Sequence, residues 1–412
     1  MQNPTIELLE ILEDPVVDVQ HLRLYVYKNG VPNNNKLRSK VWKLLLRYYS
    51  PDQRTWVNTD QSFIKLYRKQ RSLFYDTVKV RSNSQDVSPG TTPKSEELMM
   101  SRIIRTAQQS QTKLRESEEG QIELDAEKRD SPKLENRTIN TNPTKDEEEF
   151  IFRDKKLAKI IDKDLARTND GEKKAKYNPV LKRILNIMSN MPGGIPYVQG
   201  LNVIANVFYH VFIDASDSCS EELAEVSTFF CMSMLLSNIR DWFDPSYDLK
   251  PTGIRASMGR VMWCVKQKNS RLADTVNKMI DPTFYLFRWL SLLGALELPM
   301  EVTMQMWDRM FVEVRGMRYL IAFLAAMILE VECSVGRFED TLKLLQNYPI
   351  KDFERLHTTT CLLLRDVFRI NPAKVDWNEK PVGCVQGMDI PEHKKESSTL
   401  DTPLLKFFKG FK

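Results

Sequence analysis

The sequence predicts an all-α fold, and three observations support that prediction. Glycine accounts for only 15 of 412 residues, about half of its average share of roughly 7%. Hairpin turns and phosphate-binding loops both depend on glycine, so a sheet-based nucleotide-binding enzyme is disfavoured. Apolar residues recur at the spacing of one helix face in both halves of the chain. The segment that does alternate as a strand would, residues 21–27, stands alone.

This periodicity places individual helices. Residues 37–48 carry apolar side chains at i, i+4, i+7, i+8 and i+11, and residues 181–188 and 258–265 repeat the pattern over shorter runs. The run 319–329 is apolar on all sides, which predicts a fully buried helix in a second bundle. We expect helices to start or stop at the prolines between such runs, which are Pro179, Pro196, Pro251, Pro282, Pro299 and Pro349.

Composition divides the chain into four segments. Residues 76–149 contain no Phe, Tyr or Trp and are rich in Ser, Thr, Lys and Glu. Such a segment cannot bury enough apolar surface to offset its ordering entropy, so we expect a disordered insert, with room for a short helix at 96–113. The insert separates N-terminal helices in 1–75 from further helical lobes in 150–370, and a polar tail follows in 371–412.

The tail ends in the basic and apolar segment LLKFFKGFK at 404–412. So short a segment cannot hold a helix alone in water. Docking onto the domain and peripheral contact with a membrane surface both fit its composition, and the sequence leaves the two open.

Several function classes lack their sequence patterns. The six cysteines form no CxxC pair and the four histidines are scattered, so we expect an intracellular, reduced protein without a zinc site or a disulfide framework. There is no GxxxxGK[ST], GxSxG, HExxH or Rossmann fingerprint. A net charge of +5 is too small to indicate a nucleic-acid partner. The acidic N-terminus is unlike a signal peptide, and no apolar run is long enough to span a bilayer. We therefore expect a cytoplasmic protein with no metal or cofactor of its own.

Two short motifs remain as candidates for chemistry. The segment from Ile161 to Arg167 fits I-x-x-D-x-x-R, and the segment from Tyr197 to Gly200 fits Y-x-Q-G. Each alone is weak, since Arg167 could be a solvated surface residue and the second motif a helix start after a turn. Both occur in this order after GVP at 30–32 and LRxxVW at 37–42, which makes the combination specific.

With these motifs the chain resembles the TBC-domain proteins, helical GTPase-activating modules for Rab GTPases, which are called Ypt proteins in fungi. The resemblance covers about 30–356, interrupted by the insert, and continues in AEVSTFFC at 224–231, FRW at 287–289, ELP at 297–299 and WD at 307–308. It is strongest to the branch typified by TBC domain family member thirteen and its fungal relatives. The fold that it implies is a two-lobed, all-α TBC domain.

The resemblance also implies roles for residues. Arg167 is expected to be an arginine finger and Gln199 a glutamine finger, both supplied in trans to a GTP-bound Rab that brings its own GTP and Mg²⁺. The protein would then activate an enzyme rather than be one. Supporting or GTPase-binding roles are expected for the remaining motif residues and one upstream arginine, which are Ile161, Asp164, Thr168, Tyr197, Gly200, Asn202 and Arg38.

The expected setting is vesicle-mediated protein transport. We expect a monomer in the cytoplasm, held peripherally at Golgi or endosomal membranes. Two alternatives stay open, namely a non-catalytic helical scaffold that binds a Rab or another trafficking protein, and a helical adaptor with no link to GTPases.

Charge is concentrated around the first motif. Residues 150–183 contain eleven Lys and Arg against five Asp and Glu, an excess of +6 that exceeds the net charge of the whole chain. Such a local field could attract an acidic GTPase and speed encounter at low salt. It could equally be one solvated helix face.

Overall fold

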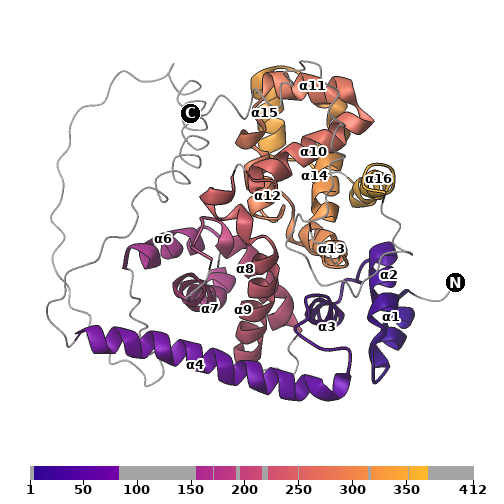
Figure 1. Cartoon of the computed structure of the whole chain (residues 1–412). Coiled ribbons are helices and arrows are strands. Elements are labelled where there is room, and N and C mark those ends of the chain that lie inside the picture. Colours follow the sequence, from indigo (N-terminus) through magenta and orange to yellow (C-terminus); the bar gives the residue numbers. More distant parts are fainter. Residues whose placement is uncertain are drawn as a thin grey trace, which may run out of the picture. The chain divides into compact units, whose positions relative to one another are not determined.

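The computed structural model describes residues 4–82, 155–169, 171–191, 195–215, 221–248, 250–313, 317–350 and 352–369 (Figure 1). In these ranges the regular structure is helical, and the one extended pairing is an isolated antiparallel bridge between Val16 and Asp52. This confirms the all-α prediction. The predicted disordered insert lies outside the described residues except for its first part, which is helical to Ser82. The predicted helix at 96–113 and the tail at 371–412 also lie outside them.

Fifteen α-helices are described, with short 3₁₀ turns η1 to η5 between some of them. The first eight are α1 (Pro4–Glu13), α2 (Val19–Asn29), α3 (Asn35–Leu45), α4 (Trp56–Ser82), α6 (Lys155–Leu165), α7 (Gly171–Asn190), α8 (Leu201–Asp214) and α9 (Glu221–Asn238). The others are α10 (Ile254–Lys268), α11 (Ser270–Met279), α12 (Leu286–Ser291), α13 (Met300–Met310), α14 (Arg318–Glu330), α15 (Phe338–Gln346) and α16 (Phe353–Asp366).

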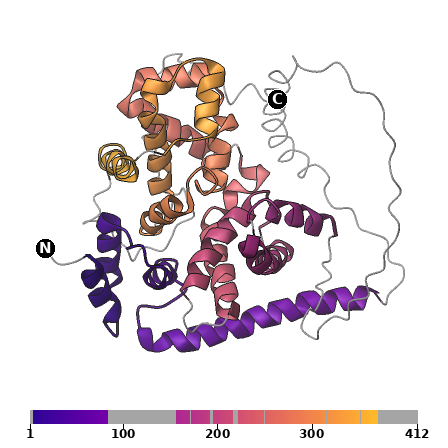
Figure 2. The ribbon, with the colours of Figure 1, turned by 180° about the vertical axis from the view of Figure 1, so that it is seen from behind.

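The helices pack in two groups, as a two-lobed domain requires. In the first group α8 packs on α9, α7 and α3, and α6 packs on α7 and α8. In the second group α14 packs on α10, α16 and α12, and α10 also packs on α11. Helix α13 contacts α14 of the second group and α2 near the N-terminus. Both groups are visible from either side of the molecule (Figures 1 and 2).

Helix α3 forms where the periodicity predicts a helix. Asn34 caps its N-terminus by accepting hydrogen bonds from the backbone N–H groups of Lys36 and Leu37. Its apolar face is buried against α8 and includes Val41 and Trp42, both fully buried. The helix ends at Leu45, so Tyr48 packs from the following turn rather than from the helix.

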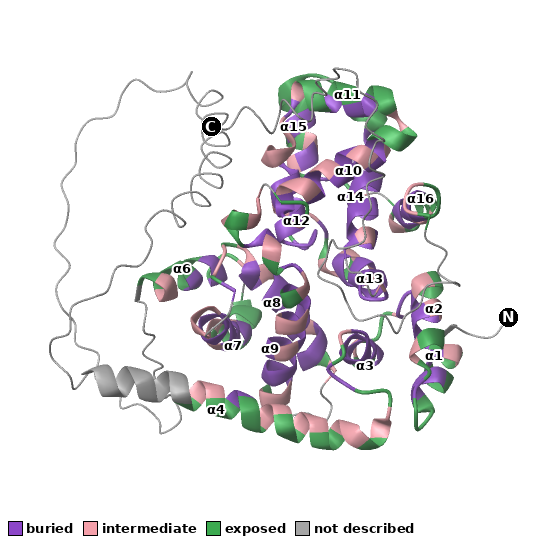
Figure 3. Cartoon of the chain, viewed as in Figure 1, coloured by how far each residue is buried: buried purple, intermediate pink, exposed green. Residues whose placement is uncertain are grey.

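Helix α14 is the centre of the second group. Its residues from Tyr319 to Ile328 are all buried, as the unbroken apolar run predicts (Figure 3). Helices on several sides cover it, which explains why no polar face is needed. Among the described helices, none has both the length and the hydropathy that crossing a bilayer requires.

The proline predictions are correct with one exception. Pro299 directly precedes α13, and Pro196, Pro251, Pro282 and Pro349 lie outside the α-helices. Pro179, however, lies inside α7. Its ring is on the exposed side of the helix, while the opposite face packs on α6, α8 and α9. Burial of that face therefore offsets the loss of one backbone hydrogen bond, which costs about 3 kcal/mol in an isolated helix.

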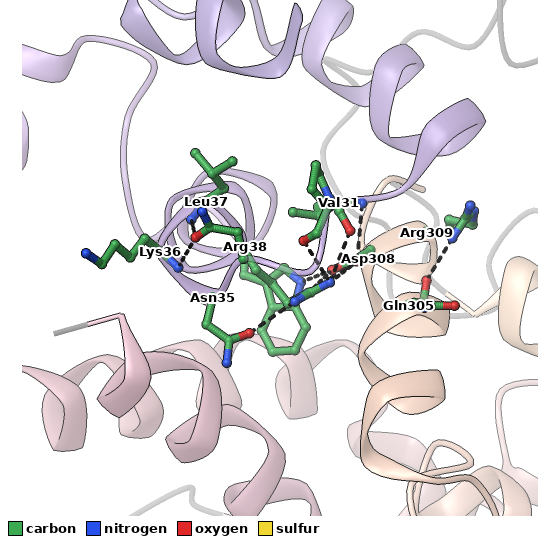
Figure 4. A network of polar contacts seen from close by, with 11 residues as sticks. Val31, Asn35, Lys36, Leu37, Arg38, Gln305, Asp308 and Arg309 are labelled. Carbon is green, nitrogen blue, oxygen red and sulfur yellow. Dashed lines mark hydrogen bonds and ion pairs between the residues drawn. The ribbon is translucent and has the colours of Figure 1, made fainter. Parts of the chain in front are cut away.

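A buried carboxylate joins α3 to α13, and we call its surroundings the Asp308 hub (Figure 4). Arg38 Nε lies 3.0 Å from Asp308 Oδ1, and Arg38 Nη2 lies 3.2 Å from Oδ2. Trp42 Nε1 donates to Oδ1 at 2.7 Å, and the Val31 N–H donates to Oδ2 at 3.3 Å. Arg38 is 1% exposed and Asp308 0% exposed, so the hub is shielded from water.

Candidate functional site

The geometry of α6 explains the spacing of the first motif. At about 100° per residue, Leu165 lies about 40° to one side of Ile161 and Asp164 about 60° to the other. All three side chains are buried. Arg167 follows in the turn after the helix, about 120° away from Ile161 by the same count, and it is exposed. The apolar and acidic residues of the motif therefore lie on the buried face of α6, and the arginine points toward solvent.

The turn that carries Arg167 is held by its own backbone. The Arg167 N–H donates to the Asp164 carbonyl at 3.1 Å, and the Thr168 N–H donates to the Leu165 carbonyl at 3.1 Å. The Thr168 hydroxyl donates to the same Asp164 carbonyl at 2.8 Å. These bonds satisfy carbonyl groups that the end of a helix would leave without partners.

The second motif lies in the loop before α8. Gln199 is exposed, whereas Tyr197 turns its hydroxyl inward and donates to Asp164 Oδ2 at 2.8 Å. Gly200 has φ of 102°, a left-handed conformation that suits glycine. A Cβ atom there would also lie 2.6 Å from Leu292 Cδ2, so the close packing leaves no room for a side chain.

Helix α8 then closes the connection between the two motifs. Asn202 Nδ2 donates to Thr168 Oγ1 at 2.5 Å and lies 3.4 Å from the Asp164 carbonyl oxygen. The Tyr197 hydroxyl lies 3.4 Å from Asn202 Oδ1. We call Asp164, Thr168, Tyr197 and Asn202 the Asp164 cluster. It ties the turn that bears Arg167 to the loop that bears Gln199.

The electrostatics of the cluster differ from those of its rim. Burial raises the pKa of the Asp164 carboxyl, while the Tyr197 hydrogen bond and the charge of Arg167 oppose that rise. Burial and the neighbouring Asp164 charge raise the pKa of Tyr197, so its hydroxyl stays protonated and can donate. Arg167 forms no ion pair with any residue that the structure describes. Its guanidinium is therefore available to a negatively charged partner.

The positive charge around the first motif is partly compensated. Arg183 pairs with Glu225 at 2.6 Å, Lys182 with Asp162 at 2.8 Å, and Lys176 lies 3.8 Å from Glu221. Four further lysines of α6 and α7 are exposed and have no ion pair to a described residue, namely Lys159, Lys163, Lys173 and Lys174. A positive surface thus remains around Arg167.

Most of the residues predicted from the motifs meet here, but Arg38 does not. Its bonds go to the Asp308 hub and to the carbonyls of Val31 and Pro32. Because its guanidinium is buried and already paired, Arg38 has a supporting place within the fold, which is one of the two roles expected for it. Ile161 is fully buried as well and supports α6 from within.

Three asparagines around the turn were not found from the sequence. Asn169 Nδ2 donates to Asn206 Oδ1 at 3.0 Å and to Asn178 Oδ1 at 3.2 Å. Asn178 Nδ2 donates to the Leu165 carbonyl at 3.0 Å. The one available signal is that Asn206 follows Asn202 by four residues, which places both on one face of α8.

The arrangement offers an exposed cation and an exposed amide on two adjoining, internally bonded segments. Such a pair can act on a negatively charged group and a water presented by another molecule. Within the part of the chain that the structure describes, no group of three or more His, Cys, Asp or Glu side chains could hold a metal ion.

The fold of the chain is similar to that of a solved protein domain. The chain is similar to the Ypt/Rab-GAP domain of Gyp1p, whose crystal structure superposes with a TM-score of 0.58 at 20% identity and covers 88% of this chain and 96% of that domain. At this identity the likeness is one of fold. It agrees with the two-group helical architecture.

Two sequence alignments show which proteins this chain resembles. A segment of 176 residues is 35% identical to mouse and human TBC1 domain family member 13, and it covers 42% of this chain and 44% of those relatives. A segment of 204 residues is 28% identical to a TBC domain-containing protein of Schizosaccharomyces pombe, covering 45% of this chain and 33% of that relative. The chain therefore matches less than half of the length of each of these relatives.

The family profile covers more of the chain than the sequence alignments to these relatives do. Residues 124–335, just over half of the sequence, match the Rab-GTPase-TBC domain. This range includes both motifs and the whole Asp164 cluster. The chain belongs to the RabGAP-TBC family.

Proposed function

We propose that this protein stimulates GTP hydrolysis by a GTP-bound Rab or Ypt GTPase and supplies Arg167 and Gln199 in trans. The observation that carries the proposal is the Asp164 cluster, which fixes the segments of both residues to each other while both side chains remain exposed. Two exposed side chains on segments held together in this way are suited to reach into the active site of another protein.

The chemistry of hydrolysis explains the need for a cation. In phosphoryl transfer, negative charge develops on the transferred phosphoryl group and on the leaving oxygen. A guanidinium stabilises that charge with a planar set of donors, and it stays protonated at any physiological pH. An arginine supplied in trans accelerates such reactions by about 10³ to 10⁵, equivalent to roughly 4 to 7 kcal/mol.

The chemistry also explains the amide. An attacking water must lie in line with the bond that breaks, and a group that both donates and accepts can hold it there. Gln199 has such an amide, and the loop around it is closed by a hydrogen bond from the Leu201 N–H to the Val198 carbonyl at 3.1 Å. We propose that it positions the water in place of the GTPase's own glutamine.

The wider setting follows from this activity. The GTPase would bring GTP and Mg²⁺, and the protein would act as a monomer without a cofactor in vesicle-mediated transport. We propose a cytoplasmic protein at the surface of Golgi or endosomal membranes, and the segment 404–412 remains the candidate for peripheral membrane contact.

A single-turnover assay with GTP-loaded Rab proteins tests the proposal. Arg167→Ala should lower the stimulated rate by at least about 10³ because the charge on the phosphoryl group loses its partner. Its melting temperature should be unchanged, since the side chain is exposed. A variant that binds GTP-loaded Rab and retains more than about a tenth of the wild-type rate would favour the alternative of a non-catalytic scaffold.

A second assay isolates Gln199. A substrate Rab whose own catalytic Gln is replaced by Leu should still be stimulated by the wild-type protein, because Gln199 would hold the water. Gln199→Ala should lose most of that stimulation, although somewhat less than Arg167→Ala, since holding a neutral water involves less charge than stabilising an anion. If the Leu-bearing Rab binds normally but is not stimulated, the role assigned to Gln199 is wrong.

A further inference from the structure

Arg167 is carried by a turn whose position depends on contacts beyond the two sequence motifs. The turn follows α6 and leads to α7, and Asn169 near its end is 7% exposed although asparagine is usually exposed. A buried amide needs hydrogen-bond partners, and Asn169 finds two on different helices. Asn206 of α8 accepts its N–H at 3.0 Å and Asn178 of α7 accepts at 3.2 Å.

The same asparagines form hydrogen bonds to the chain both before and after Arg167. On the N-terminal side, Asn178 Nδ2 donates to the Leu165 carbonyl at 3.0 Å. On the C-terminal side, Asn169 is held by Asn206, which is 8% exposed. The Arg167 side chain forms no ion pair with a described residue, so its position depends on its backbone bond to Asp164 and on these neighbouring residues.

We propose that Asn169, Asn178 and Asn206 form a clamp that positions Arg167 for its action on the GTPase. This rests on the proposed function of Arg167. The clamp residues do not touch the GTPase or the nucleotide; they are positioning residues that act through Arg167. Helix α8 thereby serves both segments, since the Gln199 loop leads into its first turn and Asn206 in its second turn holds the arginine turn.

Positioning of this kind acts on rate more than on binding. A displacement of about 1 Å at a catalytic group can lower a rate by about 10²-fold. Asn206→Leu keeps the size of the side chain but removes the oxygen that accepts from Asn169. We expect this variant to lower kcat for stimulated hydrolysis by about 10-fold and to change KM for the GTPase by less than about 2-fold.

Hydrogen exchange tests the clamp without any GTPase. In Asn206→Leu, amide exchange should accelerate in residues 165–169 and stay unchanged in α14. Asn206→Asp retains an acceptor oxygen at the same place and should restore much of the protection. The matched control is Asn190→Leu, because among the described residues the hydrogen bond of the Asn190 side chain stays within its own helix, to the Asn186 carbonyl. Equal exchange in residues 165–169 of wild type and Asn206→Leu would overturn the clamp.

A double-mutant cycle tests the catalytic consequence. If Asn206 acts through Arg167, Asn206→Leu should change the rate by less than about 2-fold in an Arg167→Ala background. In a Gln199→Ala background it should still cause the full loss of about 10-fold. An equal loss in both backgrounds would show general damage to the fold and overturn the proposal.

The two hypotheses fail differently. Retention of stimulation by Arg167→Ala contradicts the proposed function, whereas an inactive Arg167→Ala together with a fully active Asn206→Leu contradicts only the clamp. If Asn206→Leu does not fold, Asn178→Ala serves the same cycle, because Asn178 is only half-buried and supplies one contact on each side of Arg167.

Discussion

The Asp308 hub and the Asp164 cluster both join distant segments through a buried aspartate, but they treat charge in opposite ways. In the hub, the carboxylate is paired directly with the guanidinium of Arg38, and both groups are buried. In the cluster, Asp164 accepts a hydrogen bond from the neutral hydroxyl of Tyr197, while the nearby Arg167 remains exposed. One arrangement uses its cation internally, and the other leaves its cation for a partner.

This difference separates stability from function. A buried ion pair leaves an uncompensated charge when one partner is removed, so the hub should matter mainly for folding. The cluster contains no buried ion pair, and its hydrogen bonds come from neutral donors and set the position of two exposed side chains. Variants of the two regions should therefore affect different measurements.

The largest effect on stability is expected at the hub. Asp308→Ala would leave Arg38 buried without its carboxylate and Trp42 Nε1 without its acceptor. We expect the free energy of unfolding to fall by about 3 to 5 kcal/mol in a denaturant titration. Arg68→Ala, which breaks the exposed pair with Glu222, is the control and should leave the midpoint unchanged. A hub variant as stable as the control would contradict the comparison.

A smaller effect is expected at the cluster. Tyr197→Phe removes the donor to Asp164 Oδ2 and leaves a buried acceptor, which should lower the free energy of unfolding by about 1 to 3 kcal/mol. The stimulated rate should fall as well, because the two segments lose a direct link. Tyr209→Phe is a matched control, since the buried Tyr209 hydroxyl has no hydrogen-bond partner in the described structure. The control should be neutral or slightly stabilising.

The stability loss of Tyr197→Phe should also depend on pH. Burial raises the pKa of Asp164 above its ordinary 3.8, and the tyrosine bond opposes this by favouring the carboxylate. Removing the bond raises that pKa further, so the folded variant holds its proton more tightly than the wild type. The difference in unfolding free energy should be largest near pH 7 and should shrink as pH falls toward about 4. A difference that is constant over this range would mean that Asp164 does not depend on Tyr197.

The smallest effect is expected from the positive surface around Arg167. Lys159→Glu with Lys163→Glu should lower kcat/KM for a GTPase by a few-fold at low salt, because attraction between the proteins is reduced. The effect should fade above roughly 0.1 M salt, where screening acts within about 10 Å. Lys278→Glu on α11 reverses an exposed charge in the other helix group and is the control. A salt-independent loss would point to damage in α6 instead.

Local sequence features determined much of this protein. Sparse glycine and a 3.6-residue apolar period were sufficient to predict an all-α fold. The low glycine content disfavours tight turns, and the period marks the buried face of each helix. The buried run in α14 could be predicted for that reason. The two motifs also indicated Arg167 and Gln199, through the resemblance to the TBC-domain proteins that they carry.

Only the tertiary structure determined which residues on the buried faces of different helices contact each other. Arg38 and Asp308 are 270 positions apart, and Asn169 and Asn206 are 37 apart. Periodicity shows that a residue points inward but not which residue it meets, so neither the pairing of Arg38 with Asp308 nor the contacts among the three asparagines could be predicted from the sequence. Pro179 gives the same lesson, because packing of α7 on its neighbours outweighs a local preference to end the helix.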